Sequence, residues 1–273
     1  MSKYNKISIN KEEYYTIQKI KNRVVTVPSD ELKKKQKYFM NAIKWIYPIK
    51  QSTVETAKIH LNKKWILKMD IKDFFSSVPF DDIQNIIMHV LKYYNKESEF
   101  INHIILTTIN NKLPVGAPTS PYLANACFIG IDKTIKNICY LYDVNYSRYV
   151  DDLIFSSDYI EDLNLIEKRV KDVLDYHGYK INPKKTKYIS DNKQQNILGL
   201  VINDNKIRLS KAFKRKIRAM IHSKYNKKDL KYLAWNTNSE YSLNGYLNYI
   251  KNIDKEFYSK LKCYQVQLSK KYS

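Results

Sequence analysis

Two adjacent acidic residues, Asp151 and Asp152, lie between two runs that favour β-strands. The runs at 144–150 and 153–157 contain many β-branched and aromatic residues, which is typical of strands. Two short strands that follow each other so closely favour a hairpin. We therefore expect both carboxylates at the tip of one hairpin, where the fold must accommodate two negative charges side by side.

The rest of the chain mixes helical and strand patterns. Ser29, followed by Asp30, marks the start of a helix with an apolar stripe at helical spacing. We also expect helices at 81–94, 100–109, 120–140 and 163–176, strands at 65–71, 196–202 and 206–209, and only helices after Ser210. This order favours an α+β body, 1–209, followed by an all-α tail, 210–273.

The chain is strongly basic. Its 48 Lys and Arg residues against 27 Asp and Glu residues give a formal charge of +21 and a pI near 9.6. This indicates a polyanionic partner, because cations that neutralise phosphates release condensed counterions. A lysine-rich proteome is the alternative explanation. Nucleic acid is favoured over an anionic membrane, since no predicted helix combines a basic face with an exposed apolar one.

Targeting and redox features are few. The N-terminus is polar, and no stretch approaches about 18 uninterrupted apolar residues, so we expect neither a signal peptide nor a membrane span. Cys127, Cys139 and Cys263 follow no CxxC or Cys/His spacing, which argues against a disulfide framework and a zinc site. A cytoplasmic location fits these features.

A third aspartate, Asp70, ends the predicted strand at 65–71 and would extend from the rim of a sheet. If the hairpin tip lies beside it, three carboxylates gather in one place. Such a cluster is unfavourable unless cations neutralise it. Oxygen ligands that leave room for water and phosphate favour Mg²⁺, and two such ions can activate a 3′-hydroxyl and stabilise a leaving oxygen. Any one aspartate alone is more simply a cap or turn residue.

Several motifs carry a family resemblance. RYVDDL at 148–153 resembles the YxDD signature of reverse transcriptases, DIKDFFSSV at 70–78 their first catalytic motif, and LPVGAPTSPYLAN at 113–125 their template-side motif. Further blocks that agree lie at 23–36, 181–187 and 243–262. The GAPTSP form together with RYVDD is similar to bacterial retron enzymes. The resemblance implies a right-hand polymerase fold, with fingers and palm in 1–209 and an α-helical thumb in 210–273.

The resemblance also implies catalytic roles. Asp70 and Asp151 would hold two Mg²⁺ ions, with Asp152 in support and the carbonyl of Ile71 as a further ligand. Lys185 would lie near the leaving pyrophosphate as a proton donor. Taken alone, Lys185 is a single charge among 48 Lys and Arg residues.

Five residues are implied to bind the incoming nucleotide. They are Asp73 and Phe74 through their backbone N–H groups, Phe75 as an aromatic gate under the sugar, Arg23 at the triphosphate, and Gly116 beside the nascent base pair. Simpler explanations exist here too: Phe75 could be core, and Arg23 could be an ordinary surface charge. His60, in a family-like AxxH element, is more often a hydrogen-bonded structural residue.

The basic segment after Ser210 has an apolar stripe at Phe213, Ile217, Met220 and Ile221. Its cations lie largely off this stripe and are Lys211, Lys214, Arg215 and Arg218. A solvated face is the default explanation of such a charge run. In a polymerase thumb, the same helix would grip RNA or its duplex with DNA along the minor groove.

Retron enzymes copy a structured noncoding RNA, priming from an internal guanosine 2′-hydroxyl, into branched RNA–DNA. The resemblance therefore implies noncoding RNA as template and primer, dNTP substrates, a DNA product, and an effector or toxin protein in antiphage defence. The chain departs from the family at Val115, where Gln is frequent, at Thr56, where Asn is usual, and at 197–199, where VTG is usual. Two alternatives remain, a non-retron bacterial enzyme (abortive-infection or stand-alone) and a catalytically silent RNA-binding scaffold.

Overall fold

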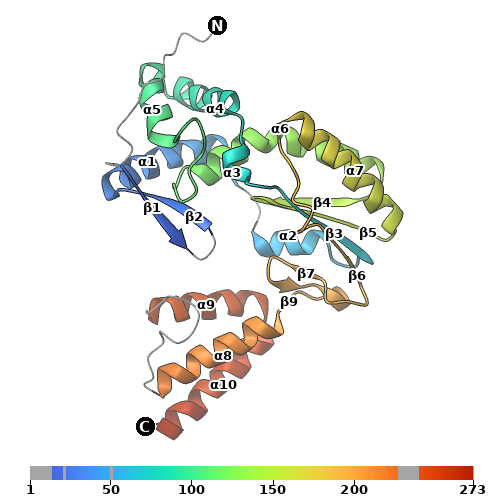
Figure 1. Ribbon diagram of the computed structural model, residues 1–273. Coiled ribbons are helices and arrows are strands. Elements are labelled where there is room, and N and C mark those ends of the chain that lie inside the picture. Colours follow the sequence, from blue (N-terminus) through green and yellow to red (C-terminus); the bar gives the residue numbers. More distant parts are fainter. Residues whose placement is uncertain (1–13, 21–22, 50–51, 227–239, 273) are drawn as a thin grey trace.

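The computed structural model describes residues 14–20, 23–49, 52–226 and 240–272 (Figure 1). At the centre of this part is an antiparallel sheet with the strand order β4-β5-β3-β6. Its strands are β3 (Trp65–Asp70), β4 (Asn145–Tyr149), β5 (Asp152–Ser157) and β6 (Lys187–Ser190). The two aspartate-bearing strands, β3 and β5, are therefore the two inner strands of the sheet.

One face of the central sheet packs against two long helices, α6 (Ser120–Leu141) and α7 (Ile160–Tyr176). Leu67 and Met69 of β3 alternate with side chains of the opposite face and are buried beneath these helices. Leu153 and Phe155 do the same from β5. Each such side chain contributes about 1.5–3 kcal/mol on burial, so this core fixes the register of the strands.

An N-terminal lobe extends the same core. It contains β1 (Tyr15–Ile20), β2 (Arg23–Pro28), α1 (Asp30–Ile46), α3 (Phe74–Ser77), α4 (Phe80–Tyr93), the 3₁₀ turn Glu97–Glu99 and α5 (Phe100–Thr107). Phe39 and Ile43 from the apolar stripe of α1 are buried in this core, as is Ile83 of α4. The lobe is thus continuous with the sheet rather than an independent unit.

The opposite face of the central sheet belongs to a second core. Ile66 of β3 and Ile154 of β5 share this core with Ile217 of the C-terminal helices. Its elements are α2 (Thr53–Ile59), β7 (Asn196–Ile197), β8 (Leu200–Val201), the 3₁₀ turn Asn203–Asn205, β9 (Arg208–Leu209), α8 (Lys211–Tyr225), α9 (Glu240–Ile253) and α10 (Lys255–Tyr272). In Figure 1, the C-terminal helices lie below the central sheet, whereas α6 and α7 lie above it.

Most predicted elements are present, with small differences. Ser29 caps α1 by accepting the N–H of Leu32 at 3.3 Å. The strand predicted at 196–202 was wrong as one strand, because Leu198 and Gly199 adopt positive φ and turn the chain between β7 and β8. Thr119 precedes α6, and the hydroxyl of Ser120, the first residue of the helix, donates to the carbonyl of Pro114. Among the described helices, none is long and apolar enough to cross a membrane.

The buried His60 links α2 to the central sheet. Its Nδ1 lies 2.8 Å from the hydroxyl of Ser156 and its Nε2 lies 2.7 Å from that of Ser147. Burial lowers the pKa of His60 to about 3. Both ring nitrogens are occupied by protein partners, so His60 is a structural residue, which confirms the simpler of its two interpretations.

We expect His60→Ala to lower the free energy of unfolding by about 3 kcal/mol, because two buried hydroxyls lose their partner and a cavity forms. In the wild type, the free energy of unfolding should fall as the pH drops below about 6.5, because His60 binds a proton in the unfolded protein but not in the folded protein. Urea titrations at pH 7 and pH 5 should show a smaller pH effect in the variant. The exposed His177 offers a control; if His177→Ala flattens the pH dependence equally, His60 is not its source.

Candidate active site

Asp70 and Asp152 are direct neighbours across two paired strands. The antiparallel register of β3 and β5 places Asp70 opposite Asp152, with Lys68 two residues earlier on the same face. Residues directly opposite each other have Cβ atoms roughly 4.5–5.5 Å apart and point to the same side of the sheet. The Asp70 side chain is largely buried, at 8% exposure for the residue. The sheet therefore brings two carboxylates together at one rim.

Asp151 joins them from the loop of the β4–β5 hairpin. The loop consists of Val150 and Asp151, because Tyr149 already pairs with Asp152. The N–H of Ile71 donates to the carbonyl of Asp151 at 3.0 Å, which fixes the hairpin tip beside the end of β3. The predicted hairpin is thus confirmed, and all three aspartates lie at its tip or at the adjoining end of β3.

Lys185 reaches the same rim from a distant segment. The N–H of Asn182 donates to the backbone carbonyl of Asp70 at 2.8 Å, which holds the segment after α7 against the end of β3. The Lys185 ammonium then lies 2.6 Å from Oδ1 of Asp70. Lys185 is 115 positions away from Asp70 in the sequence, so only the fold brings them together.

The electrostatics of the rim are those of crowded carboxylates. Burial raises the pKa of Asp152, and the neighbouring charges of Asp151 and Asp70 raise it further, while Lys68 and Lys185 oppose the shift. The donor atoms are carboxylate oxygens, which suit a hard cation such as Mg²⁺. Among the described residues, however, no three Asp, Glu, His or Cys side chains are grouped closely enough to hold one metal ion. In this arrangement the Lys185 ammonium neutralises Asp70.

The DIKDFF turn lies directly after Asp70. Asp73 adopts a left-handed conformation, with φ 50° and ψ 41°, and its carbonyl accepts the hydroxyls of Ser76 and Ser77. Phe74 begins α3 and is buried against Phe128, at 5.7 Å between ring centroids. N–H groups in a first helical turn have no acceptor within their own helix. The backbone of this turn, rather than the Phe74 ring, is thus what a ligand could reach.

Phe75 and Arg23 were also predicted to contact the nucleotide. Phe75 is partly buried and packs against the main core, so its ring has a structural role whatever else it does. Arg23 begins β2, but its side chain falls outside the described residues.

Gly116 lies where two segments touch. Its φ of 115° and the position of its Cα leave no room for a side chain, since a Cβ would lie 2.7 Å from the carbonyl oxygen of Thr26. The N–H of Thr26 in turn donates to the carbonyl of Val115 at 2.7 Å. Glycine is required here because the loop before α6 packs directly on strand β2.

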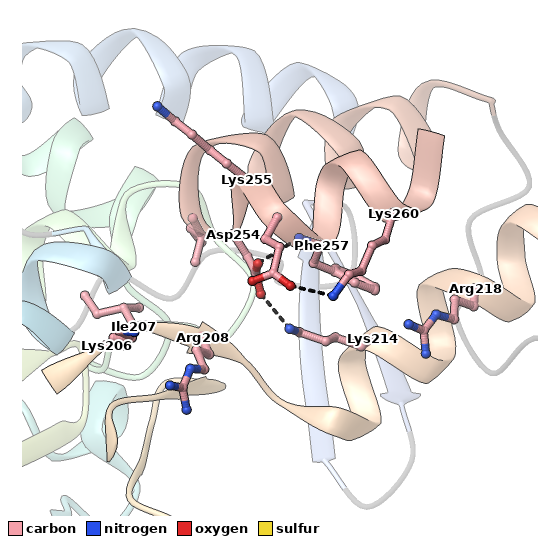
Figure 2. A pocket seen from close by; sticks show the side chains of 11 residues that line it. Lys206, Ile207, Arg208, Lys214, Arg218, Asp254, Lys255, Phe257 and Lys260 are labelled. Atoms are coloured by element: carbon pink, nitrogen blue, oxygen red, sulfur yellow. Dashed lines mark hydrogen bonds and ion pairs between the residues drawn. The ribbon is translucent and has the colours of Figure 1, made fainter. Parts of the chain in front are cut away.

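The four cations predicted to bind RNA fall into two groups. Lys211 and Arg215 are exposed on α8. Lys214 instead points inward and forms an ion pair with Asp254 at 2.6 Å, with its ammonium 4.8 Å from the centre of the Phe257 ring (Figure 2). Arg218 is exposed like the first two, but its guanidinium lies over the same ring, 5.2 Å from its centre. Lys214 therefore stabilises the helical bundle, which its position in the charge run did not indicate.

A basic hollow of about 410 Å³ adjoins this pair (Figure 2). Burial raises the pKa of Asp254, but hydrogen bonds from Lys214 and from the N–H of Phe257 outweigh this and leave the pKa lowered. The charged residues that line the hollow are Lys206, Arg208, Lys214, Arg218, Lys255 and Lys260, with Asp254 and Glu256. Positive charge predominates, as a surface that meets phosphates requires.

Sequence reasoning missed two basic residues of the site. Lys68 could have been found from strand alternation, because it is two residues before Asp70 and so shares its face. Arg148, in the RYVDDL motif, pairs with Asp132 at 2.6 Å. Nothing in the sequence indicates that partner, which comes from the middle of α6.

Comparison with known proteins decides the family. Residues 9–202 match the family described as "Reverse transcriptase (RNA-dependent DNA polymerase)". The chain belongs to the reverse transcriptase family. Similar curated proteins include the retron Ec86 reverse transcriptase of Escherichia coli, 29% identical over 81% of this chain and 66% of that protein. The retron Ec73 enzyme of the same species is 30% identical over 88% of this chain and 81% of that protein. The retron Mx65 enzyme of Myxococcus xanthus is 26% identical over 72% of this chain and 48% of that protein. The chain therefore spans only about half to four fifths of the length of these relatives.

Solved structures of a telomerase and of a viral reverse transcriptase share the fold. A telomerase from Candida tropicalis with a fragment of telomeric RNA superposes with a TM-score of 0.56, at 13% identity, over 95% of this chain and 55% of that one. A foamy viral protease–reverse transcriptase with double-stranded DNA superposes with a TM-score of 0.51, at 18% identity, over 94% of this chain and 42% of that one. The fold is thus the predicted right-hand polymerase fold. Following the division that the resemblance implies, we call the central sheet with α6 and α7 the palm, β1–α1 and α4–α5 the fingers, and α8–α10 the thumb.

Asp152→Asn should raise the melting temperature in metal-free buffer at pH 7. The raised pKa means that ionised Asp152 costs folding free energy at neutral pH, and this cost disappears as the pH falls toward the ordinary range of aspartate, about 3.9. Each kcal/mol gained corresponds to about 2–4 °C for a chain of this size. Circular dichroism melts between pH 7 and pH 4 measure the effect.

Asp158→Asn is the matched control. The hydrogen bond from Lys63 lowers the pKa of Asp158, so its ionised form stabilises the fold and its replacement should lower the melting temperature. If both variants melt lower than the wild type at pH 7, carboxylate crowding at Asp152 is not a destabilising feature.

Proposed function

We propose that this protein is an RNA-directed DNA polymerase that uses the palm rim as its catalytic centre. The observation that supports this most directly is the register that places Asp70 opposite Asp152, with Asp151 at the adjoining hairpin tip. In a member of the reverse transcriptase family, these are the carboxylates of the YxDD signature and of the first catalytic motif.

The carboxylate oxygens at the rim are of the kind that Mg²⁺ prefers, and two ions would bind there once the described acidic side chains, which do not form a three-ligand group in this arrangement, move closer together. Asp70 and Asp151 would hold them, supported by Asp152 and by the carbonyl of Ile71. When bound, such ions lower the pKa of an attacking 3′-hydroxyl and neutralise charge on the leaving oxygen. Lys185, now 2.6 Å from Asp70, would release that carboxylate and turn its ammonium toward the leaving pyrophosphate, where it can donate a proton.

The surfaces around the rim suit an incoming dNTP. The N–H groups of Asp73 and Phe74 would bind phosphate oxygens, and Arg23 would approach the triphosphate from the fingers. Phe75 would exclude a 2′-hydroxyl by steric conflict. Gly116, which already packs directly on β2, would let the backbone approach the nascent base pair.

We further propose a retron-type role in the cytoplasm. The curated relatives named above are retron reverse transcriptases, which supports a structured noncoding RNA as template and primer, branched DNA as product, and an effector protein in antiphage defence. Sequencing the nucleic acid that copurifies with the protein tests this. DNA joined through a 2′-linkage to RNA from the protein's own locus supports it, and unbranched products from unrelated RNA contradict it.

Asp151→Asn should abolish DNA synthesis while leaving folding and RNA binding nearly intact. Loss of one metal ligand removes several kcal/mol of transition-state stabilisation, so the rate should fall at least about 1,000-fold. Primer extension on an RNA template with Mg²⁺ and dNTPs measures this. Extension by the variant at the wild-type rate would refute the assignment, and Asp143→Asn, in the exposed turn before β4, serves as control.

Substitutions in the two groups of thumb cations should have different effects, one on RNA binding and the other on stability. Replacing Lys211 and Arg215 by Ala should weaken RNA binding and reduce the slope of log affinity against log salt by about 2, roughly one per phosphate contact. Lys214→Ala should instead lower the free energy of unfolding by about 1–2 kcal/mol, because Asp254 loses its partner. Fluorescence anisotropy at several salt concentrations and urea titrations measure the two effects. An unchanged salt slope in the double variant would place RNA binding elsewhere.

A further inference from the structure

We propose that Arg148 is a positioning residue, which holds a strained turn at Val150 and thereby fixes the backbone of Asp151. The inference deepens the proposed polymerase function and rests on it. It depends on three features of the described residues: an unfavourable backbone conformation next to Asp151, a guanidinium bonded to that turn, and a rigid set of partners that fixes the guanidinium.

The turn before Asp151 is strained. Val150 and Asp151 form the two-residue loop between β4 and β5. Val150 has a φ of 58°, and Asp151 is not among the residues with positive φ. A left-handed first residue and an ordinary second residue are typical of a type II′ hairpin turn, in which the first position favours glycine. A β-branched residue there is an outlier that persists only when its surroundings hold it.

A hydrogen bond from Arg148 holds this turn in place. Its Nη1 donates to the carbonyl oxygen of Val150 at 3.0 Å. This carbonyl and the N–H of Asp151 belong to one planar peptide group, so fixing the oxygen fixes the plane from which Asp151 extends. The bond thus acts on a metal-ligand candidate through its backbone.

The guanidinium itself is fixed on several sides. Its Nε lies 3.0 Å from both carboxylate oxygens of Asp132, and Nη2 lies 2.6 Å from Oδ2 of Asp132 and 2.9 Å from Oδ1 of Asn125. The plane lies over the Phe128 ring, at 4.6 Å. The Tyr146 hydroxyl donates to Asp132 at 2.7 Å and orients the carboxylate. The Arg148 side chain is only 6% exposed.

This geometry requires an arginine. Asp132, Asn125 and Phe128 all lie on α6, so the planar fork of Arg148 connects that helix to the catalytic turn. A lysine could still neutralise Asp132, but a single ammonium cannot bond Asp132 and the Val150 carbonyl in the same fixed plane. Replacing Arg148 by lysine therefore keeps a positive charge beside Asp132 but removes the support of the Val150 turn.

The test compares Arg148→Lys with the double variant Arg148→Lys/Val150→Gly in the full chain. Arg148→Lys should lower kcat for primer extension by about 100-fold with little change in the KM for dNTP, because a displaced ligand affects the chemical step. It should also raise the Mg²⁺ concentration at which the protein reaches half of the increase in melting temperature that the metal produces. Val150→Gly should restore both quantities to within about fivefold, since glycine adopts a positive φ without support.

Tyr188→Phe is the matched control. It removes a hydrogen bond to Glu167 in the palm but leaves Arg148 and all of its partners in place, so it should lower the melting temperature without changing kcat by more than about twofold. If Arg148→Lys fails to fold, Asp132→Asn, which loosens the guanidinium without removing it, replaces it in the same comparison.

The outcomes separate this inference from the proposed function. A wild-type protein without polymerase activity refutes the function. If the wild type is active, a kcat of Arg148→Lys equal to that of the wild type refutes the positioning role. A loss of kcat that follows the melting temperature and is not restored by Val150→Gly also refutes it, since Arg148 would then only stabilise the fold.

Discussion

The pairing of β3 with β5 imposes a like-charge contact on which the rest of the site depends. Two aspartates opposite each other on one face are unfavourable in a sheet, and here Asp70 opposes Asp152. The register cannot slip to relieve the contact, because a shift by one residue would move Leu67 and Phe155 out of the core. Apolar packing therefore holds the two carboxylates together, and the cations Lys68 and Lys185 offset part of the repulsion.

The alternation of side chains along β3 also explains why the palm and thumb are not separate bodies. Met69 and Leu67 face the core of fingers and palm, whereas Ile66 faces the core that contains α8 and α10. The small sheet β7–β9 lies in this second core and extends it from the palm to the thumb. A sequence boundary at 209–210 is therefore a change of secondary structure rather than the edge of an independent core.

Local sequence patterns predicted much of the fold, but they did not predict the contacts between distant segments. The hairpin at Asp151, the strand ending at Asp70 and the helix capped by Ser29 carry periodicity or capping signals of their own. The hairpin of β1 and β2, the short helix α2 and the partly exposed strand β6 were not predicted, since short elements depend on their neighbours. The ion pair of Lys214 with Asp254 and that of Arg148 with Asp132 join distant segments, and charge runs do not reveal such partners. The functional roles of the catalytic motifs came from family resemblance rather than from pattern.

The close packing of Gly116 on Thr26 has a mechanical consequence. The Thr26–Val115 hydrogen bond is 2.7 Å long, and no side chain at position 116 lies between the two backbones. A displacement of strand β2 must therefore either break that bond or push the start of α6 with it. Since α6 also carries Asp132, the partner of Arg148, the same helix adjoins the fingers hairpin at its start and, through Arg148, the turn that presents Asp151.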